Sequence, residues 1–133
     1  MTYTHDPKLL ERAGEAVGWL ITVTPRGRPA PRPVWFVLDG DDVVVFSKPD
    51  TAKIRHLAAN PEVSFHLNSN ESGGSIIVVN GRARIDEAKA SEAPGYLGKY
   101  QRRYAGIGYT EPAEFDAVYS VRIRIVPEKS WGF

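Results

Sequence analysis

The sequence of 133 residues contains no cysteine and no long hydrophobic run. The lack of cysteine excludes disulfide bonds, thiolate metal sites and a cysteine nucleophile. Apolar runs such as Ile76–Val79 are only as long as a strand, whereas a membrane-spanning helix needs ~18–20 residues. The first residues also lack the basic and then apolar layout of a secretory signal. We therefore expect a cytoplasmic protein with no membrane partner.

A strong charge of either sign is also missing. Lys and Arg number 17 and Asp and Glu number 16, which gives a formal net charge of +1. A chain whose main partner is a nucleic acid would carry a clear basic excess, so no nucleic-acid partner is expected. Hydrophobic residues at 42% and charged residues at 25% are typical of a globular protein rather than a disordered one. The length predicts a single domain over residues 1–133.

Several catalytic motifs are absent as well. The chain has neither a P-loop nor a dinucleotide-binding glycine pattern, and it has no G-x-S-x-G motif. His5, His56 and His66 share no metal-binding spacing, so we expect no metal site. If the protein is an enzyme, a bound organic cofactor would have to supply the chemistry, and no catalytic side chain is predicted.

Helical spacing of apolar residues marks three segments. The first pattern predicts an amphipathic helix over residues 7–17, with Asp6 as its N-cap and Gly18 at its end. A second, short helix is predicted over residues 51–59. Residues 88–104 are predicted to be helical in part, because Pro and Gly interrupt the pattern.

Alternating or continuous apolar patterns predict the strands, which cover residues 19–23, 31–38, 43–46, 63–67, 75–86 and 117–126. Most of them are joined by short turns, such as Asp39-Gly40-Asp41. Six or seven strands with so few helices predict a mostly β fold, a small antiparallel barrel whose sheet edges are closed or covered.

Aromatic residues outside the central strands have predicted places too. Trp19 is expected in the core, and Trp131 and Phe133 are expected to plug the barrel, the alternative being that they reach a partner chain's site. The tract 96–104 mixes tyrosines with arginines. It is interpreted as a solvated helix face rather than an RNA-binding surface, because no second basic surface supports RNA binding.

The start of the predicted helix over residues 51–59 is a candidate phosphate site. A first helical turn offers free backbone N–H groups and the positive end of the helix dipole. Thr51 can add a hydroxyl donor beside Ala52, and Lys53 can add a positive charge. The alternative is a capped surface helix in which Lys53 and Arg55 are simply solvated.

The order and spacing of several short segments resemble one known family over about residues 8–126. The segments are Gly27-Arg28-Pro29, Val43-Val44-Val45-Phe46-Ser47, Lys53-x-Arg55-x-Leu57, Asn60-Pro61, Val63-Ser64-Phe65 and Gly81-x-Ala83. The chain thus resembles the pyridoxamine 5′-phosphate oxidase-like FMN-binding split-barrel superfamily. Within it, the chain is similar to an actinobacterial branch of small proteins that use the deazaflavin coenzyme F420. The resemblance implies a split β-barrel of six or seven antiparallel strands that forms a homodimer.

This resemblance also implies which residues bind the cofactor. Lys53 would bind its phosphate, helped by Thr51 and the backbone amides around Ala52. The polar edge of the cofactor would lie along the end of the preceding strand, and its ring against the segment that includes Trp35, which would otherwise be a core residue. The remaining implied contacts are Arg32, Pro33, Val34, Phe46, Ser47, Lys48 and, at the start of the long strand, Ile76.

The implied function is that of an F420-dependent oxidoreductase, in which hydride passes from the reduced coenzyme to a small conjugated organic acceptor. The cofactor would lie at the subunit interface, and acceptor choice would depend on residues 69–74 and 105–114. Ala52 stands where pyridoxamine phosphate oxidases often have a second basic residue. Those enzymes also carry a substrate-binding arginine near a longer C-terminus, and this sequence ends at Phe133 without one, so that activity is not expected. FMN in place of F420, or a non-catalytic carrier of flavin, deazaflavin or haem, are the alternatives.

Overall fold

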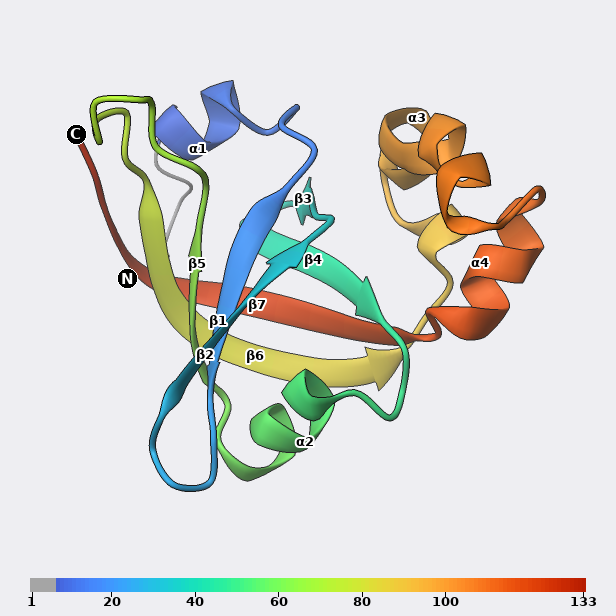
Figure 1. Ribbon diagram of the computed structural model, residues 1–133, viewed down its shortest axis with the longest axis horizontal. Helices are drawn as coiled ribbons and strands as arrows, with labels where there is room; N and C mark the ends of the chain where they lie inside the picture. Colours follow the sequence, from blue (N-terminus) through green and yellow to red (C-terminus); the bar gives the residue numbers. More distant parts are fainter. Residues whose placement is uncertain (1–6) are drawn as a thin grey trace.

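The fold is one antiparallel sheet of seven strands that curls into a barrel, with short helices beside it (Figure 1). The computed structural model describes residues 7–133, so the predicted N-cap Asp6 lies outside them. The strands are β1 (Gly18–Val23), β2 (Pro29–Val34), β3 (Val37–Asp39), β4 (Asp42–Ser47), β5 (Glu62–His66), β6 (Val78–Glu87) and β7 (Val121–Trp131). The helices are α1 (Pro7–Glu11), α2 (Ala52–Ala59), η1 (Ala90–Glu92), α3 (Tyr96–Tyr100), η2 (Gln101–Arg103), η3 (Ala105–Ile107) and α4 (Pro112–Val118).

The strand order is β2-β1-β5-β6-β7-β4-β3, and every neighbouring pair is antiparallel. The ladder between β6 and β7 runs from Val78 to Glu87 with a register shift at Asn80/Gly81. A Cβ atom at Gly81 would lie 2.3 Å from the carbonyl oxygen of Val126, so only glycine allows this close approach. The predicted mostly β, split-barrel fold of six to seven antiparallel strands is confirmed.

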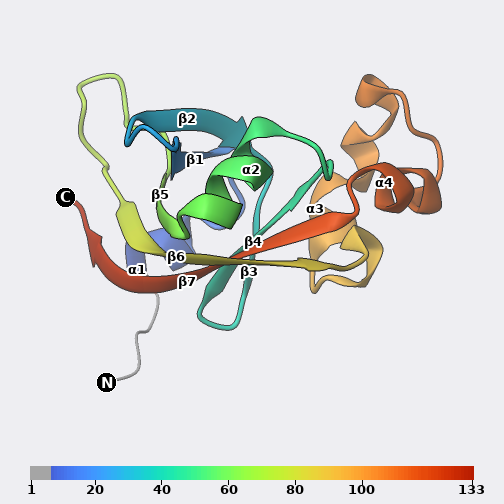
Figure 2. The ribbon, with the colours of Figure 1, turned by 90° about the horizontal axis from the view of Figure 1, so that it is seen from below.

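Apolar side chains on the inner face of the curled sheet fill the barrel. Leu20, Phe65 and Ile123 are each 0% exposed, and α2 adds the buried Leu57. Figure 2 shows α2 between the β1–β2 layer and the β6–β7 layer. The helix therefore closes one end of the barrel, and its first turn is held in a fixed place beside the sheet.

A second unit, which we call the cap, is formed by residues 88–120. It contains η1, α3, η2, η3 and α4 and lies to one side of the barrel (Figure 1). Tyr96, Tyr100, Tyr104 and Phe115 form its centre, and together with Val37, Val44 and Phe46 they make a cluster separate from the barrel core. The cap thus packs on the outside of β3 and β4, leaving a seam between cap and barrel.

The first predicted helix and strand differ from the structure. The helix α1 ends at Glu11, and residues 12–17 form turns and irregular backbone. Gly18 does not end the helix but begins β1, and a glycine is needed there because a Cβ atom would lie 2.4 Å from the Phe65 ring. The predicted strand 31–38 is two strands, since the chain leaves β1 after Val34 and then pairs with β4.

The last predicted strand, residues 117–126, was placed too early. Residues 112–118 form α4, which Glu111 and Glu114 cap reciprocally with Pro112 in the first turn. This capping box is a helix-start signal. The strand β7 begins only at Val121, and from there Val121, Ile123 and Ile125 are buried as the alternation predicts.

Three aromatic predictions were wrong. Trp19 is only half-buried, on the outer face of β1, because Leu20 and Thr22 take the inward positions. Trp131 and Phe133 do not plug the barrel, which its own side chains already fill; they are 49% and 71% exposed. The tail is held instead by backbone hydrogen bonds between Phe133 and Ile76.

The third wrong prediction concerns the tyrosines of the cap. Tyr96, Tyr100 and Tyr104 are at most 1% exposed, not on a solvated face. They follow one another at the four-residue spacing that stacks side chains on one side of a helix, and that side faces β3 and β4. No helix among residues 7–133 is long and apolar enough to cross a membrane.

Candidate cofactor site

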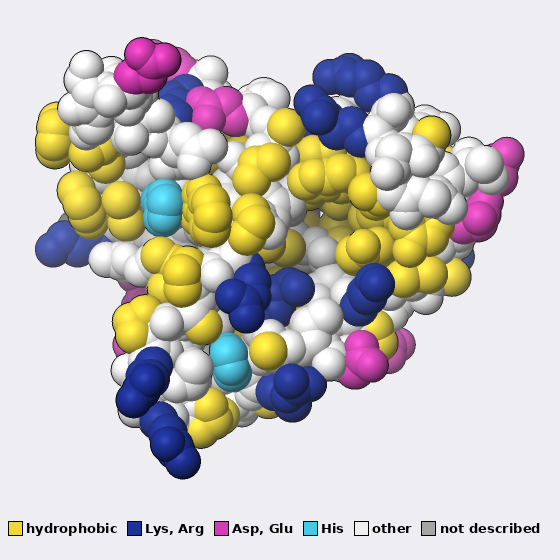
Figure 3. Space-filling model, viewed as in Figure 1, with side chains coloured by type: hydrophobic (Ala, Val, Ile, Leu, Met, Phe, Trp, Pro, Cys, Tyr) yellow, Lys and Arg dark blue, Asp and Glu magenta, His cyan; other side chains and the backbone are white. Residues whose placement is uncertain are grey.

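A cavity of ≈ 380 Å³ lies in the seam between barrel and cap. Figure 3 shows this face of the molecule hollowed there, with apolar side chains around the hollow and Lys and Arg side chains below it, over β2 and α2. The lining residues from the barrel side are Val17, Pro33, Val34, Trp35, Phe46 and Lys53, and those from the cap are Tyr96, Ile107, Phe115 and Tyr119.

The break between β2 and β3 places Trp35 in this seam. Val34 and Phe36 on either side point into the barrel core, so the indole between them turns outward to the cap. It stacks on Tyr100, with ring centroids 4.6 Å apart and ring planes 5° from parallel. Phe115 and Tyr119 stack in the same way, at 4.4 Å and 13°. The cavity is therefore walled by rings held in nearly fixed orientations.

The N-terminus of α2 lies at the end of the strand β4. Thr51 is the N-cap residue in extended conformation, but its side chain makes no capping bond to the first turn. Its hydroxyl instead shares a hydrogen bond of 3.1 Å with the Ser47 hydroxyl and contacts the Lys48 carbonyl oxygen at 3.4 Å. The first amide groups of α2, near Ala52 and Lys53, therefore have no side-chain acceptor.

Two cations lie close together at the barrel side of the cavity. Burial, and next the charge of Arg32, hold the pKa of Lys53 below its usual value. Within residues 7–133 no carboxylate pairs with either side chain, and the one side-chain hydrogen bond of Arg32 goes to the carbonyl oxygen of Pro31. An anion that entered here would relieve the repulsion between these two charges.

Arginines on the other side of the barrel are paired in a different way. Their guanidinium groups contact carboxylates of the same chain, and the pairs are Arg122 with Asp86 and Arg124 with both Asp39 and Asp42. Arg122 and Arg124 are thus neutralised by carboxylates of the chain, while Arg32 and Lys53 beside the cavity have no acidic partner among the described residues.

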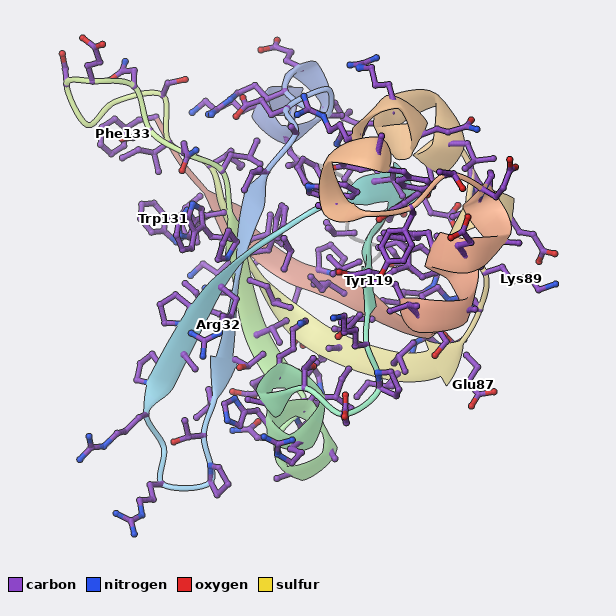
Figure 4. All side chains as sticks on the ribbon, turned by 45° about the vertical axis from the view of Figure 1, so that its right-hand side comes forward. Arg32, Glu87, Lys89, Tyr119, Trp131 and Phe133 are labelled. Carbon is purple, nitrogen blue, oxygen red and sulfur yellow. The ribbon has the colours of Figure 1, made fainter. Side chains whose placement is uncertain are left out.

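Most of the predicted site residues converge on this cavity. Pro33, Val34, Trp35, Phe46 and Lys53 line it. The others lie at its edge: Arg32 is close enough to act on Lys53, Ser47 and Thr51 are bonded to each other and flank Ala52, and Lys48 has its Nζ atom 5.7 Å from the Tyr119 ring centroid. Figure 4 shows Arg32 on β2 and Tyr119 below the cap.

Ile76 is the predicted residue that does not join the others. It lines a separate shallow hollow with Trp19, His66 and Val78, on the outer face of the sheet. Within one chain, Ile76 therefore does not contact a ligand bound at Lys53.

Sequence reasoning missed half of the cavity wall, which consists of Val17, Tyr96, Ile107, Phe115 and Tyr119. The signal that could have found the cap residues was the spacing of Tyr96, Tyr100 and Tyr104, which marks an apolar helix face. The arginines between them favoured a solvated helix instead. The described residues also contain no group of three or more His, Cys, Asp or Glu side chains that could hold a metal ion.

Comparison with known families is consistent with this geometry. The family model for pyridoxamine 5′-phosphate oxidase matches residues 7–131. The chain belongs to that family. The predicted membership is confirmed. No curated protein sequence matches the chain.

Solved structures of the same fold include proteins with different names. An F420 reductase from Mycobacterium smegmatis has a TM-score of 0.73 at 24% identity, over 96% of this chain and 98% of that one. A Listeria innocua protein named as a pyridoxamine 5′-phosphate oxidase has a TM-score of 0.61 at 25% identity, over 92% and 90%. The heme storage protein HutZ from Vibrio cholerae has a TM-score of 0.66 at 18% identity, over 98% and 95%. These likenesses show the fold that all of them share.

Proposed function

We propose that this protein is an oxidoreductase that binds coenzyme F420 in the seam and reduces a small, flat, conjugated acceptor. The observation that carries the proposal is the pair of cations, Lys53 and Arg32, which lie beside an aromatic cavity and have no acidic partner in the part of the chain that the structure describes. The likeness to an F420 reductase supports the choice of cofactor.

The phosphate of the cofactor would lie at the first turn of α2. Lys53 supplies a charge there, the amides of the first turn supply N–H donors, and Thr51 supplies a hydroxyl. A phosphate at a helix N-terminus interacts favourably with both the free amides and the helix dipole. Arg32 would add a second positive charge, so an anionic tail would also be attracted to this edge.

The ring of the cofactor would lie between Trp35 and the cap. A cavity of ≈ 380 Å³ falls within the range of about 300–1,000 Å³ usual for small-molecule sites. Reduced F420, when bound, supplies a hydride. The chain's own residues hold the flat groups in place and exclude water from them, which is the main requirement of such a transfer.

We also propose that the protein acts as a homodimer joined through the outer face of the sheet. Trp131, Phe133, Trp19 and Ile76 form an apolar stripe there, of which Trp131 and Phe133 are the most exposed. Figure 4 shows these two side chains at the edge of the molecule, beyond the barrel. A second copy would cover the stripe and could bring Ile76 to the partner's cofactor. Analytical ultracentrifugation of W131D/F133D tests this, and a variant as dimeric as the wild type contradicts it.

The first experiment is a fluorescence titration of the protein with oxidised F420, with FMN run in parallel. Micromolar or tighter binding of F420, with FMN much weaker, supports the proposal. FMN preference assigns the site to the flavin branch of the family instead. Binding of neither contradicts a cofactor role for the cavity.

The variant Lys53→Ala tests the phosphate position. Loss of this charge-assisted contact should cost on the order of 1.5–3 kcal/mol, roughly 10- to 150-fold in affinity. Lys89→Ala is the matched control, since Lys89 is exposed at the far end of β6 (Figure 4). An affinity of Lys53→Ala within twofold of the wild type would show that the phosphate lies elsewhere.

A carrier of haem is the second candidate, because the heme storage protein HutZ shares the fold. Among the described residues, however, those that line the cavity include no histidine. His56 is bonded to the Thr22 hydroxyl at 2.9 Å, and His66 lies at the separate hollow. A haem titration followed by absorbance separates the two candidates.

A further inference from the structure

Tyr96 is a buried residue whose hydroxyl has no hydrogen-bond partner in the described part of the chain. Tyr96 is 1% exposed, and it lines the cavity. Its ring packs edge-on against Phe46, at 5.1 Å between centroids, and is tilted against Tyr100 at 5.0 Å. These contacts hold the ring, but among residues 7–133 no group donates to or accepts from its hydroxyl.

The hydroxyl groups of the two neighbouring tyrosines, Tyr100 and Tyr104, have surroundings that differ from those of the Tyr96 hydroxyl. The Tyr100 hydroxyl accepts from the Phe36 amide at 2.8 Å and lies 2.8 Å from the Ala16 carbonyl oxygen. The Tyr104 hydroxyl is enclosed and unpartnered, the only such side-chain atom in the described part of the chain. The Tyr96 hydroxyl is not enclosed in that way, and the open space that Tyr96 borders is the cavity.

Polar side-chain groups away from bulk solvent are usually hydrogen-bonded, so an unpartnered hydroxyl of a residue on the cavity wall is available to a ligand. We propose that the Tyr96 hydroxyl is a ligand-binding group that donates a hydrogen bond to a carbonyl oxygen of a flat conjugated ring in the cavity. The rings of Trp35 and Phe115 are the apolar walls of the same site.

The chemistry of the wall limits the ligand to this class. Burial raises the pKa of Tyr96 far above its usual value, so the group is a neutral phenol that can donate. Among residues 7–133 no carboxylate lines the cavity, and the nearby Asp116 accepts a hydrogen bond from the Ser91 amide at 3.0 Å. The carbonyl oxygen that accepts this hydrogen bond can belong to the acceptor molecule or to the ring of the cofactor. The cofactor ring is a candidate only if the proposed function above is correct.

The variant Tyr96→Phe tests the proposal, because it removes only the oxygen atom. Equilibrium dialysis of the full chain with coumarin, a flat ring with a carbonyl, and with naphthalene, which has none, gives the preference for the carbonyl. We expect the variant to bind coumarin about 3- to 10-fold more weakly and naphthalene within twofold of the wild type. A parallel F420 titration shows whether the cofactor ring uses the same hydroxyl.

Tyr100→Phe is the matched control. It removes a hydroxyl that is bonded within the chain, so it should lower the melting temperature and leave the ratio of the two affinities unchanged. Tyr96→Phe should keep or raise the melting temperature. A loss confined to coumarin assigns the hydroxyl to the acceptor, and a loss confined to F420 assigns it to the cofactor ring. Unchanged affinities for both, or a lower melting temperature of Tyr96→Phe, would overturn the proposal.

Discussion

The barrel core and the cap cluster are built from different side chains. The barrel is filled by aliphatic residues with Phe36 and Phe65, which meet edge to face at 5.0 Å. The cap is centred on three tyrosines and Phe115, with helices of only three to seven residues. Backbone ladders join the barrel strands along their length, whereas the cap helices are too short to be stable without packing.

The cap is tied to the barrel by a few polar contacts as well as by its rings. Lys99 donates to the carbonyl oxygens of Ala13 and Phe36 at 2.8 and 2.7 Å, and its Nζ atom lies 3.6 Å from the centroid of the Phe36 ring. Tyr100 binds the backbone at the same place. We therefore expect the barrel to contribute most of the stability. The seam, where polar and apolar groups mix, contains the candidate cofactor cavity.

The largest effect is expected from the barrel. Phe65→Ala removes a ring that is 0% exposed at the centre of the core, and such a change costs about 3–5 kcal/mol of unfolding free energy. Urea denaturation should show one cooperative transition at a much lower midpoint. A variant that loses less than about 1 kcal/mol would contradict the role assigned to this core.

A smaller and more local effect is expected in the cap. Phe115→Ala removes a ring that stacks on Tyr104 at 4.5 Å and on Tyr119 at 4.4 Å. The global unfolding free energy should fall by about 1–3 kcal/mol, and hydrogen exchange of residues 96–119 should speed up far more than that of the barrel strands. Equal loss of protection in both units would show that cap and barrel unfold as one.

The smallest effect is a pH dependence of the stability, which comes from Lys99, the residue that joins the cap to the barrel. Burial lowers the pKa of Lys99 from 10.5 to about 8. Above pH 8 the unfolded chain therefore binds more protons than the folded one, and stability should rise slightly up to about pH 10.5. The melting temperature of Lys99→Met should lack this rise. A wild type that loses stability relative to Lys99→Met over this range would contradict the shift.

The sequence predicted the parts of the site that depend on local pattern. The short helix after Thr51, the buried strand over residues 43–46 and the turn at Gly40 are short-range features, and the structure has all three, with the strand one residue longer at each end. The same is true of β5 and of the alternation along β7 after Val121. The residues predicted at the cavity from the barrel side belong to these elements.

The parts that failed depend on which distant segment covers a residue. Trp19 and Leu20 are both apolar, and only the curvature of the sheet decides that Leu20 points inward. The tyrosines of the cap are buried because they pack on an apolar outer face of β3 and β4. This face exists because β4 is apolar on both sides. Arg102 and Arg103 beside them remain exposed, so the local composition was misleading.

Local spacing and order in the sequence were enough to predict a small antiparallel barrel, a short helix that begins beside Lys53 and the family of the chain. The packing of the cap over β4 and the cavity in the seam are visible only in the folded structure. The folded structure also shows that the Tyr96 hydroxyl has no hydrogen-bond partner among the described residues, while the Tyr100 hydroxyl bonds to the backbone of Ala16 and Phe36. The physical reason is that burial and hydrogen-bond satisfaction depend on groups far apart in the chain.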